Sequence, residues 1–360
     1  MIPNTGRGTL GRLERTPNVD LENYQDFCEG VRKYVYGPLN APIMTEVEKA
    51  VGEAQAAGDK DLSDIDDLHA IFDPIPIMKT RNRVMRSVQE MTWRSLTDEY
   101  YGEGTKYAGE LDAYDTRGPG TVEYNLDWEP PAYTRHPIHI QPGGYTEADL
   151  GGYVYYHGTN TFFEGMNTQD EAHTAIVQAN EIPKDGKVER VLDIGCSIGQ
   201  GAIALKERFT DAEVHAIDVG APMVRYAHKR AVDLGQEVHF AQRLAEDTKY
   251  PDNHFDVVNA FILFHEVPLE AQADILKEIF RVLRPGGIFN IFDFPHNMKD
   301  QRLPFMSYFI DVDSKDNCEP FSVDFTLCDF QQNLRDAGFN VWTGDDQIMI
   351  VKTVYAEKPA

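Results

Sequence analysis

The stretch VLDIGCSIGQG, residues 191–201, decides the fold of this chain. An apolar run ends in an acid, Asp193, and glycines then follow at positions 195, 199 and 201. Apolar residues resume at helical spacing behind them, so the pattern predicts a strand, a tight glycine turn and a helix. Such a turn places backbone N–H groups and a helix N-terminus beside one ligand pocket.

Downstream of this turn, predicted strands and helices alternate. Strands are expected at 190–195, 213–218, 237–242, 255–261 and 287–294, with helices between them. This alternation predicts a Rossmann-like α/β fold, a mostly parallel sheet with helices on both faces. Residues 339–344 and 347–358 are expected to complete a seven-stranded sheet as a terminal antiparallel hairpin.

The remaining chain divides by composition into two further regions. Residues 1–20 are polar and are expected to form a flexible arm. Residues 21–150 are mainly helical in pattern and end in a linker rich in proline and glycine, which marks the main boundary. This region is expected to be a lid or a dimerisation element, the second of which would make the protein a homodimer. Residues 151–360 then form the α/β domain.

Composition excludes several classes of function. The 360 residues carry a formal charge of −25 without a basic patch, which disfavours nucleic acid as a partner. No apolar run approaches the roughly 20 residues of a membrane span, and no signal peptide is recognised at the N-terminus. The four cysteines lie far apart without a metal-binding spacing. We therefore expect a soluble, cytoplasmic protein that contains no metal.

The ligand of the turn is expected to be a nucleoside. The second predicted strand ends in Asp218, where a carboxylate accepts hydrogen bonds from a ribose diol. Short-chain dehydrogenases share the glycine spacing, but they need a Tyr-x-x-x-Lys pair that is missing after Gly201. Asp193 would oppose a pyrophosphate and suits a ligand with an ammonium and a sulfonium.

Four segments, in this order, resemble the motifs of class I S-adenosylmethionine-dependent methyltransferases, most closely the type 11, ubiquinone/menaquinone-biosynthesis-like group. They are VLDIGCSIGQG (191–201), HAIDVGAPMVRYA (215–227), AEDTKYPDNHFDVV (245–258) and IFRVLRPGG (279–287). The resemblance implies methyl transfer to an O, N, C or S atom of a small molecule, which the aromatic residues before the turn suggest is apolar or aromatic. The first 150 residues carry no such resemblance.

The resemblance also implies which residues bind the cofactor. Asp193 and the turn backbone would hold its methionine end, Asp218 the ribose, and Met223 and the 245–246 loop the adenine. Two family positions differ here, since Ser197 replaces a glycine and Leu244 an acid. The full set is Asp193, Gly195, Cys196, Ser197, Gly199, Asp218, Val219, Met223, Ala245, Glu246, Asn259 and Tyr153. Purely structural roles stay open: a helix cap for Asp218, core packing for Met223 and a solvated charge for Glu246.

The segment FHEVP, residues 264–268, supplies the candidate catalytic groups. His265 is the candidate base, because imidazole titrates near neutral pH, and Glu266 would orient it. Alternatively, Glu266 caps the next helix and His265 packs beneath it. Aromatic residues between 145 and 163 would cover the sulfonium, line the acceptor pocket or fill an interdomain core.

Two other functions remain open from sequence alone. One is an S-adenosylmethionine-binding protein with non-methylating chemistry, and the other is a non-catalytic nucleoside-binding scaffold. HPIH (136–139) is expected to hold ordinary loop histidines, and DVDSKDN (311–317) to form an acidic loop.

Overall fold

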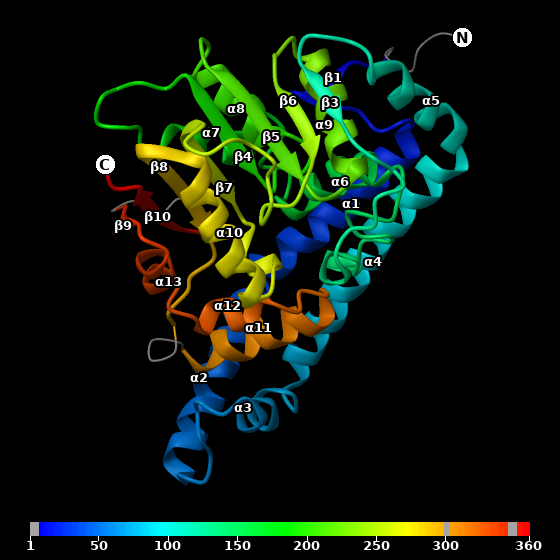
Figure 1. Cartoon of the computed structure of the whole chain (residues 1–360). Coiled ribbons are helices and arrows are strands. Elements are labelled where there is room, and N and C mark those ends of the chain that lie inside the picture. The colour runs from blue at the N-terminus through cyan, green and yellow to red at the C-terminus, as the bar shows by residue number, and fades with distance from the viewer. Residues whose placement is uncertain (1–6, 299–302, 345–350) are drawn as a thin grey trace.

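A twisted eight-stranded sheet forms the centre of the computed structural model, which describes residues 7–298, 303–344 and 351–360 (Figure 1). The strands are β3 (Thr121–Glu123), β4 (Arg190–Ile194), β5 (Glu213–Asp218), β6 (His239–Gln242), β7 (Phe255–Phe261), β8 (Leu283–Asp293), β9 (Asn340–Thr343) and β10 (Lys352–Glu357). Their order is β3-β6-β5-β4-β7-β8-β10-β9.

The predicted α/β fold is confirmed, with one strand more than expected. The strands from β3 to β8 in this order pair in parallel, whereas β10 runs antiparallel to both β8 and β9. The terminal hairpin is therefore present; residues 345–350 lie outside the described residues. The additional strand is β3, which the linker contributes to the sheet edge beside β6.

Helices cover both faces of the sheet because alternate residues of each strand point in opposite directions. Val191 packs with α8 (Gln200–Arg208) and α9 (Ala221–Asp233) on one face. Leu192 packs with α10 (Leu269–Val282) and α13 (Phe330–Asp336) on the other. Both side chains are fully buried, so β4 forms the centre of the core.

The N-terminal helices pack directly against the α/β domain. They are α1 (Val19–Tyr36), α4 (Pro76–Gly102), α5 (Gly104–Tyr114) and α6 (Gly151–Phe162). Trp93 of α4, Tyr153 of α6 and Tyr226 of α9 belong to one buried cluster. Since α6 touches α1, α4 and α9, it connects the helical region to the sheet.

A smaller helical group extends below the sheet in Figure 1. It contains α2 (Asn40–Ala57), α3 (Ile65–Phe72) and α11 (Pro304–Asp316), joined by a buried contact between Phe72 and Tyr308. The predicted acidic loop at 311–317 is thus wrong, because most of it is the last part of α11. The remaining helices are α7 (Glu171–Gln178), α12 (Ser322–Leu327) and the 3₁₀ helices η2 (Ala132–Thr134), η3 (Ile138–Ile140) and η4 (Phe264–Glu266).

The N-terminal arm has local structure in its described part. Residues 7–20 contain a two-stranded hairpin, β1 (Thr9–Leu10) with β2 (Leu13–Glu14), and the start of α1. Tyr156 of α6 donates a hydrogen bond from its hydroxyl to the Arg12 carbonyl at 2.9 Å, which attaches the hairpin to the core.

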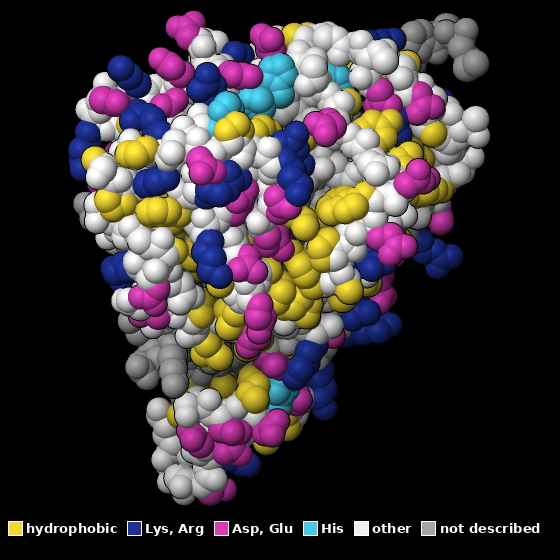
Figure 2. Space-filling view, viewed as in Figure 1, with side chains coloured by type: hydrophobic (Ala, Val, Ile, Leu, Met, Phe, Trp, Pro, Cys, Tyr) yellow, Lys and Arg dark blue, Asp and Glu magenta, His cyan; other side chains and the backbone are white. Residues whose placement is uncertain are grey.

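The surface mixes charges of both signs. On the face shown in Figure 2, the described Lys and Arg side chains are scattered among Asp and Glu, and hydrophobic side chains gather between α10 and α4. Within the described ranges, none of the helices combines the length and the apolar character that a bilayer span requires.

Candidate active site

A cavity of about 960 Å³ lies at the carboxyl ends of β4, β5 and β7. Its volume is near the upper end of the range for small-molecule sites. The glycine turn, the loop after β5 and the 243–246 segment line one part. Side chains of α1, α4, α6 and α11 line another, and η4 contributes His265 and Glu266. The lining residues of the cavity therefore come both from the ends of the strands and from the N-terminal helices.

The turn between β4 and α8 depends on left-handed backbone conformations. Gly195 has φ 64°, and a Cβ there would lie 2.8 Å from Leu263 Cδ1, so only glycine fits without a shift. Ser197 also adopts a positive φ, of 47°. Gly195, Cys196 and Ser197 line the cavity, whereas Gly199 packs against Ala227 and Phe240.

Asp218 ties the turn to the end of β5. Its Oδ2 accepts a hydrogen bond from Ser197 N at 2.9 Å, and its Oδ1 accepts one from Gly220 N at 2.8 Å. Burial raises the pKa of this carboxyl group. Each oxygen keeps a further lone pair, and Asp218 lines the cavity, so it can accept hydrogen bonds from a ligand as well.

Asp193 is the second buried carboxylate at this edge. Its Oδ1 accepts a hydrogen bond from Asn259 Nδ2 at 2.7 Å, and the Asn259 amide oxygen accepts one from Asn180 Nδ2 at 3.1 Å. Burial raises the pKa of Asp193 to about 7 despite the hydrogen bond from Asn259. Asn259 therefore lies behind Asp193 and is not among the residues that line the cavity.

The segment after β6 lines the cavity beside Asp218. Leu244, Ala245 and Glu246 of this segment contribute to the wall, together with Val219, which follows β5. The Glu246 carboxylate accepts a hydrogen bond from the hydroxyl of Tyr133, a residue of η2. Glu246 is thus held by the linker region rather than free in solvent.

His265 and Asp293 form a buried pair in which the imidazole Nδ1 lies 2.6 Å from the Asp293 Oδ1. Backbone N–H groups of Leu263 and Phe264 donate to the other carboxylate oxygen, which fixes η4 against the end of β8. Burial alone would lower the pKa of His265. The charges of Asp293, Glu266 and Glu319 outweigh this effect and raise the pKa to about 9.

The orienting partner of His265 is therefore Asp293 rather than the expected Glu266. The Glu266 Oε1 lies 3.9 Å from His265 Nε2, too far for a hydrogen bond. Burial raises the pKa of Glu266 to about 7, although His265 opposes this. Glu266 makes no side-chain cap for α10, whose N-cap residue is Pro268.

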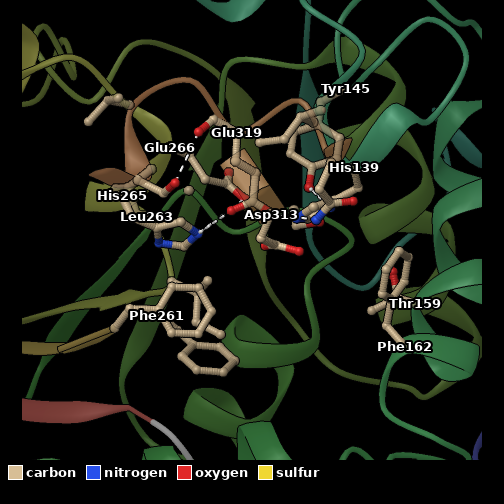
Figure 3. Close-up of a pocket in the computed structure, with 18 of the residues that line it drawn as sticks. His139, Tyr145, Thr159, Phe162, Phe261, Leu263, His265, Glu266, Asp313 and Glu319 are labelled. Carbon is tan, nitrogen blue, oxygen red and sulfur yellow. Dashed lines mark hydrogen bonds and ion pairs between the residues drawn. The ribbon is translucent and has the colours of Figure 1, made fainter. Parts of the chain in front are cut away.

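A second acid–imidazole pair, His139 with Glu319, lies beside His265 in the cavity wall (Figure 3). His139 Nε2 lies 3.1 Å from Glu319 Oε1, and the other oxygen of Glu319 lies 4.0 Å from His265 Nε2. The Tyr145 hydroxyl lies 3.0 Å from His139 Nδ1. The histidine that was expected to be an ordinary loop residue thus belongs to a connected polar cluster.

The predicted site residues divide into two groups in space. The lining group comprises Asp193, Gly195, Cys196, Ser197, Asp218, Val219, Ala245, Glu246, His265 and Glu266, with Tyr145, Tyr155, Phe162 and Phe163 of the aromatic segment. Gly199, Met223, Asn259 and Tyr153 are not among the lining residues. Met223 and Tyr153 lie in the buried cluster between α6 and α9, where Tyr153 stacks on Tyr100.

Three further polar residues of the site were not predicted from the sequence: Asp293, His139 and Glu319. Asp293 ends a predicted strand, a position that favours a ligand-facing acid, and this is the one signal that was present. His139 comes from the short helix η3 and Glu319 from an irregular segment, and they meet only in the folded chain. Among the described residues, no group of three or more His, Cys, Asp or Glu is placed to hold a metal ion.

Comparison with known protein families identifies the part of the chain that carries the turn. Residues 191–287 match the sequence profile of a family described as a methyltransferase domain. The match starts at the first residue of the quoted stretch and ends just after the start of β8.

Individual relatives match over longer but partial segments. Sterol 24-C-methyltransferase erg6 of Aspergillus fumigatus is 29% identical over 220 residues, which cover 58% of this chain and 52% of that protein. Demethylmenaquinone methyltransferase of Thermus thermophilus is 36% identical over 107 residues, 30% of this chain and 48% of that protein. The chain thus spans about half the length of these two relatives. Among solved structures, this chain is similar to phosphoethanolamine N-methyltransferase 2 of Haemonchus contortus. The alignment covers 59% of this chain and 58% of that protein, with 16% identity and a TM-score of 0.43.

Proposed function

We propose that this chain, which carries a class I S-adenosylmethionine-dependent methyltransferase domain, transfers a methyl group from that cofactor to a small organic molecule. One observation carries the proposal: a single cavity joins the glycine turn, Asp193 and Asp218 to the imidazole of His265 and to an apolar wall. The named relatives, a sterol and a menaquinone-pathway methyltransferase, support an apolar acceptor and a place near the type 11 group.

The residues present fit this cofactor. Asp193 and Asp218 are 3% and 8% exposed, and neither forms an ion pair with any residue that the structure describes. A buried carboxylate without a counter-charge is costly, and a ligand that brings an ammonium group or hydroxyl donors removes that cost. Ile217, Val219, Leu244 and Ala245 offer an apolar surface beside Asp218 that suits an adenine ring.

The residues then have distinct roles in the proposal. When bound, S-adenosylmethionine supplies an electrophilic methyl group on a sulfonium. Asp193 would bind the amino-acid end, and Asp218 the ribose hydroxyls. Tyr155, Phe261 and Phe162 would exclude water from the reacting part of the cavity and hold the acceptor in line.

His265 is the proposed base for an acceptor whose nucleophile carries a proton. Asp293 holds its Nδ1, so Nε2 is the atom that faces the cavity and would take the proton. Because the pKa of His265 is about 9, the imidazole is mostly charged at neutral pH and must first lose a proton. Methyl transfer that needs this base is therefore expected to become faster as the pH rises toward 9.

The first experiment is calorimetric titration of the whole chain with S-adenosylmethionine, S-adenosylhomocysteine and NAD. We expect micromolar binding of the first two and none of NAD. Asp218→Asn should weaken both by about tenfold or more, because a charge-assisted hydrogen bond to the ribose is lost while one acceptor oxygen stays for the turn. Asp336→Ala, an exposed aspartate on α13, is the matched control and should bind as the wild type.

Binding of NAD, or of none of the three, would contradict the proposal. If S-adenosylmethionine binds but no S-adenosylhomocysteine forms with sterol, quinone, phenol or carboxylic acid acceptors, the non-methylating alternative gains support. We further propose a cytoplasmic setting, since all four cysteines are free, and a homodimer as one assembly to test by light scattering.

A further inference from the structure

Two arginines line the part of the cavity that the N-terminal helices form. Arg32 belongs to α1 and Arg81 to α4, and they are only 6% and 8% exposed. Both guanidinium groups lie near Tyr36, at 5.7 Å (Arg32) and 5.9 Å (Arg81) from the centroid of its ring. Two buried positive charges therefore face the same space.

Neither arginine forms an ion pair with any residue that the structure describes. Arg32 Nη1 lies 3.4 Å from the amide oxygen of Gln89, and Arg81 Nη1 lies 3.0 Å from that of Asn82. The Nε of Arg32 is buried without a hydrogen-bond partner. Burial lowers the pKa of Arg32, although the more distant charges of Glu164 and Asp313 oppose this. No described carboxylate is close enough to either guanidinium for an ion pair, so an anionic ligand group can still bind there.

Each of the two guanidinium groups also lies over a second aromatic ring. Arg32 lies over Phe162 at 4.5 Å, and Arg81 lies over Phe309 at 4.7 Å. A guanidinium that stacks by its face presents its N–H groups along its edge, where they match the two oxygens of a carboxylate. The stacking also holds both groups in place before a ligand arrives.

Two carboxylates share this part of the wall, Glu164 and Asp313. Burial and the neighbouring Glu319 raise the pKa of Asp313, so its charge is reduced near neutral pH. These acids do not pair with the arginines, but they favour a ligand with a single negative charge over a doubly charged phosphate.

We infer that Arg32 and Arg81 bind a carboxylate of the methyl acceptor, which is therefore an apolar organic acid whose acidic end lies away from the reacting atom. This inference rests on the proposed function. Phe162 touches both Arg32 and, at a ring-centroid distance of 5.5 Å, His139, so the arginine pair adjoins the cluster that contains His265. Apolar lining residues of α4 and α11 would contact the body of the acid: Met85, Met306, Ile310 and Val312.

The test compares acids with their own amides. The full chain, with and without saturating S-adenosylhomocysteine, is titrated with decanoic acid, decanamide, biphenyl-4-carboxylic acid, biphenyl-4-carboxamide and decyl phosphate. We expect at least one acid to bind ten times more tightly than its amide, because two charge-assisted contacts are lost with the charge. In the double variant Arg32→Gln/Arg81→Gln, the ratio of the affinity for the acid to that for its amide should fall close to one.

Arg94→Gln is the matched control, since Arg94 lies on the same helix with its side chain 85% exposed, and it should keep the wild-type ratio. If no acid binds more tightly than its amide, or if the double variant keeps the preference for the acid, the inference is wrong. Tighter binding of decyl phosphate than of decanoate would overturn the assignment to a carboxylate. If the double variant does not fold, the ratio of acid to amide affinity in the wild type is still a valid test. Arg81→Gln alone then replaces the double variant.

The S-adenosylhomocysteine titration distinguishes failure of the acceptor assignment from failure of the proposed function. If S-adenosylhomocysteine binds and no acid does, only the acceptor assignment fails. If S-adenosylhomocysteine does not bind the wild type, the proposed function fails, and acid binding measured without it still decides whether the arginines recognise a carboxylate.

Discussion

At the scale of single residues, the contact between His265 and Asp293 determines the charge in the middle of the cavity. Asp293 accepts three backbone hydrogen bonds, from Leu263, Phe264 and Phe294, in addition to its contact with the imidazole. A carboxylate held in this way stabilises the charged form of the imidazole beside it. Burial opposes the charge of His265 most strongly, and Asp293 is the first of the acids that together outweigh it.

We expect Asp293→Asn to lower the pKa of His265 from about 9 to below its ordinary value of 6.5. Burial, which opposes the charged imidazole, then acts with little compensation. The measurement is an NMR titration of ring-labelled histidine, with the His265 signal identified from His265→Gln. Because the folded-state pKa is raised, the pair stabilises the fold fully below pH 6.5 and loses this contribution as the pH rises through about 9.

Glu266→Gln is the control for this titration. Glu266 contributes charge but no hydrogen bond to His265, so its removal should lower the pKa by a smaller amount. A His265 pKa near 6.5 in the wild type, or a His265 pKa that does not change in Asp293→Asn, would contradict the role assigned to Asp293.

Residues of the site differ in how far the sequence reveals them. Asp193 and Asp218 end strands that belong to one recognisable motif series, and their positions at the cavity follow from sheet geometry alone. His139 and Glu319 are separated by 180 positions and meet because η3 and the segment before α12 approach the same edge. No local pattern encodes such a contact, and conformations like the positive φ of His139 carry no periodic signal.

At the scale of elements, α6 is held by close approach of its glycines to neighbouring helices. A Cβ on Gly152 would lie 2.3 Å from Tyr226 Cβ and 2.8 Å from the Pro222 carbonyl oxygen, both on α9. A Cβ on Gly158 would lie 2.0 Å from the Trp93 ring on α4. These contacts bring α6 between the helical region and the sheet, where its aromatic residues reach the cavity.

We expect Gly152→Ala to destabilise the protein by about 2–4 kcal/mol, because the backbone of α9 cannot move away as a flexible side chain would. Urea unfolding followed by circular dichroism measures the change. Gly109→Ala in α5 is the matched control: nothing lies within 4 Å of its added Cβ. There, the better helix propensity of alanine should stabilise the protein by about 0.5–1 kcal/mol. Destabilisation of the same size in both variants would refute the packing argument.

The sequence predicts long periodic elements better than short ones. The five predicted parallel strands and the terminal hairpin follow from apolar runs, which in the parallel part alternate with helical segments. By contrast, β3 has three residues, too few for a periodic signal, and its pairing partner β6 lies more than 100 positions downstream. The last part of α11 was missed for another reason, because its acids Asp311, Asp313 and Asp316 leave only Val312 to face the smaller helical core.

At the scale of the whole molecule, the helical region and the sheet share a core and a cavity. One buried cluster contains Leu21 and Trp93 from the first 150 residues and Met223 and Tyr226 from the motif-bearing part. The cavity likewise needs both, since Arg32 and Arg81 come from the first part and Asp218 and His265 from the second. Neither part can therefore bury its apolar surface, or complete the site, without the other.

We accordingly expect the full chain to unfold in urea as one cooperative unit. A Trp128→Phe/Trp342→Phe variant leaves Trp93 as the only tryptophan, so its fluorescence reports on the interface of α4 with α6. Hydrogen exchange of β4 and β7, followed in the same urea series, reports on the sheet. The two midpoints should coincide, because opening the interface exposes the shared core.

Saturating S-adenosylhomocysteine provides the control for this experiment. A ligand that binds only the folded state should raise both midpoints by the same amount, since its proposed site needs both parts. If Trp93 loses its native signal at lower urea while β4 stays protected, the helical region is a separately stable lid, and the acceptor end of the cavity opens without unfolding of the sheet. A single transition instead means that Arg32 and Arg81 are fixed relative to the glycine turn, so the distance between the two ends limits the length of acid that the site accepts.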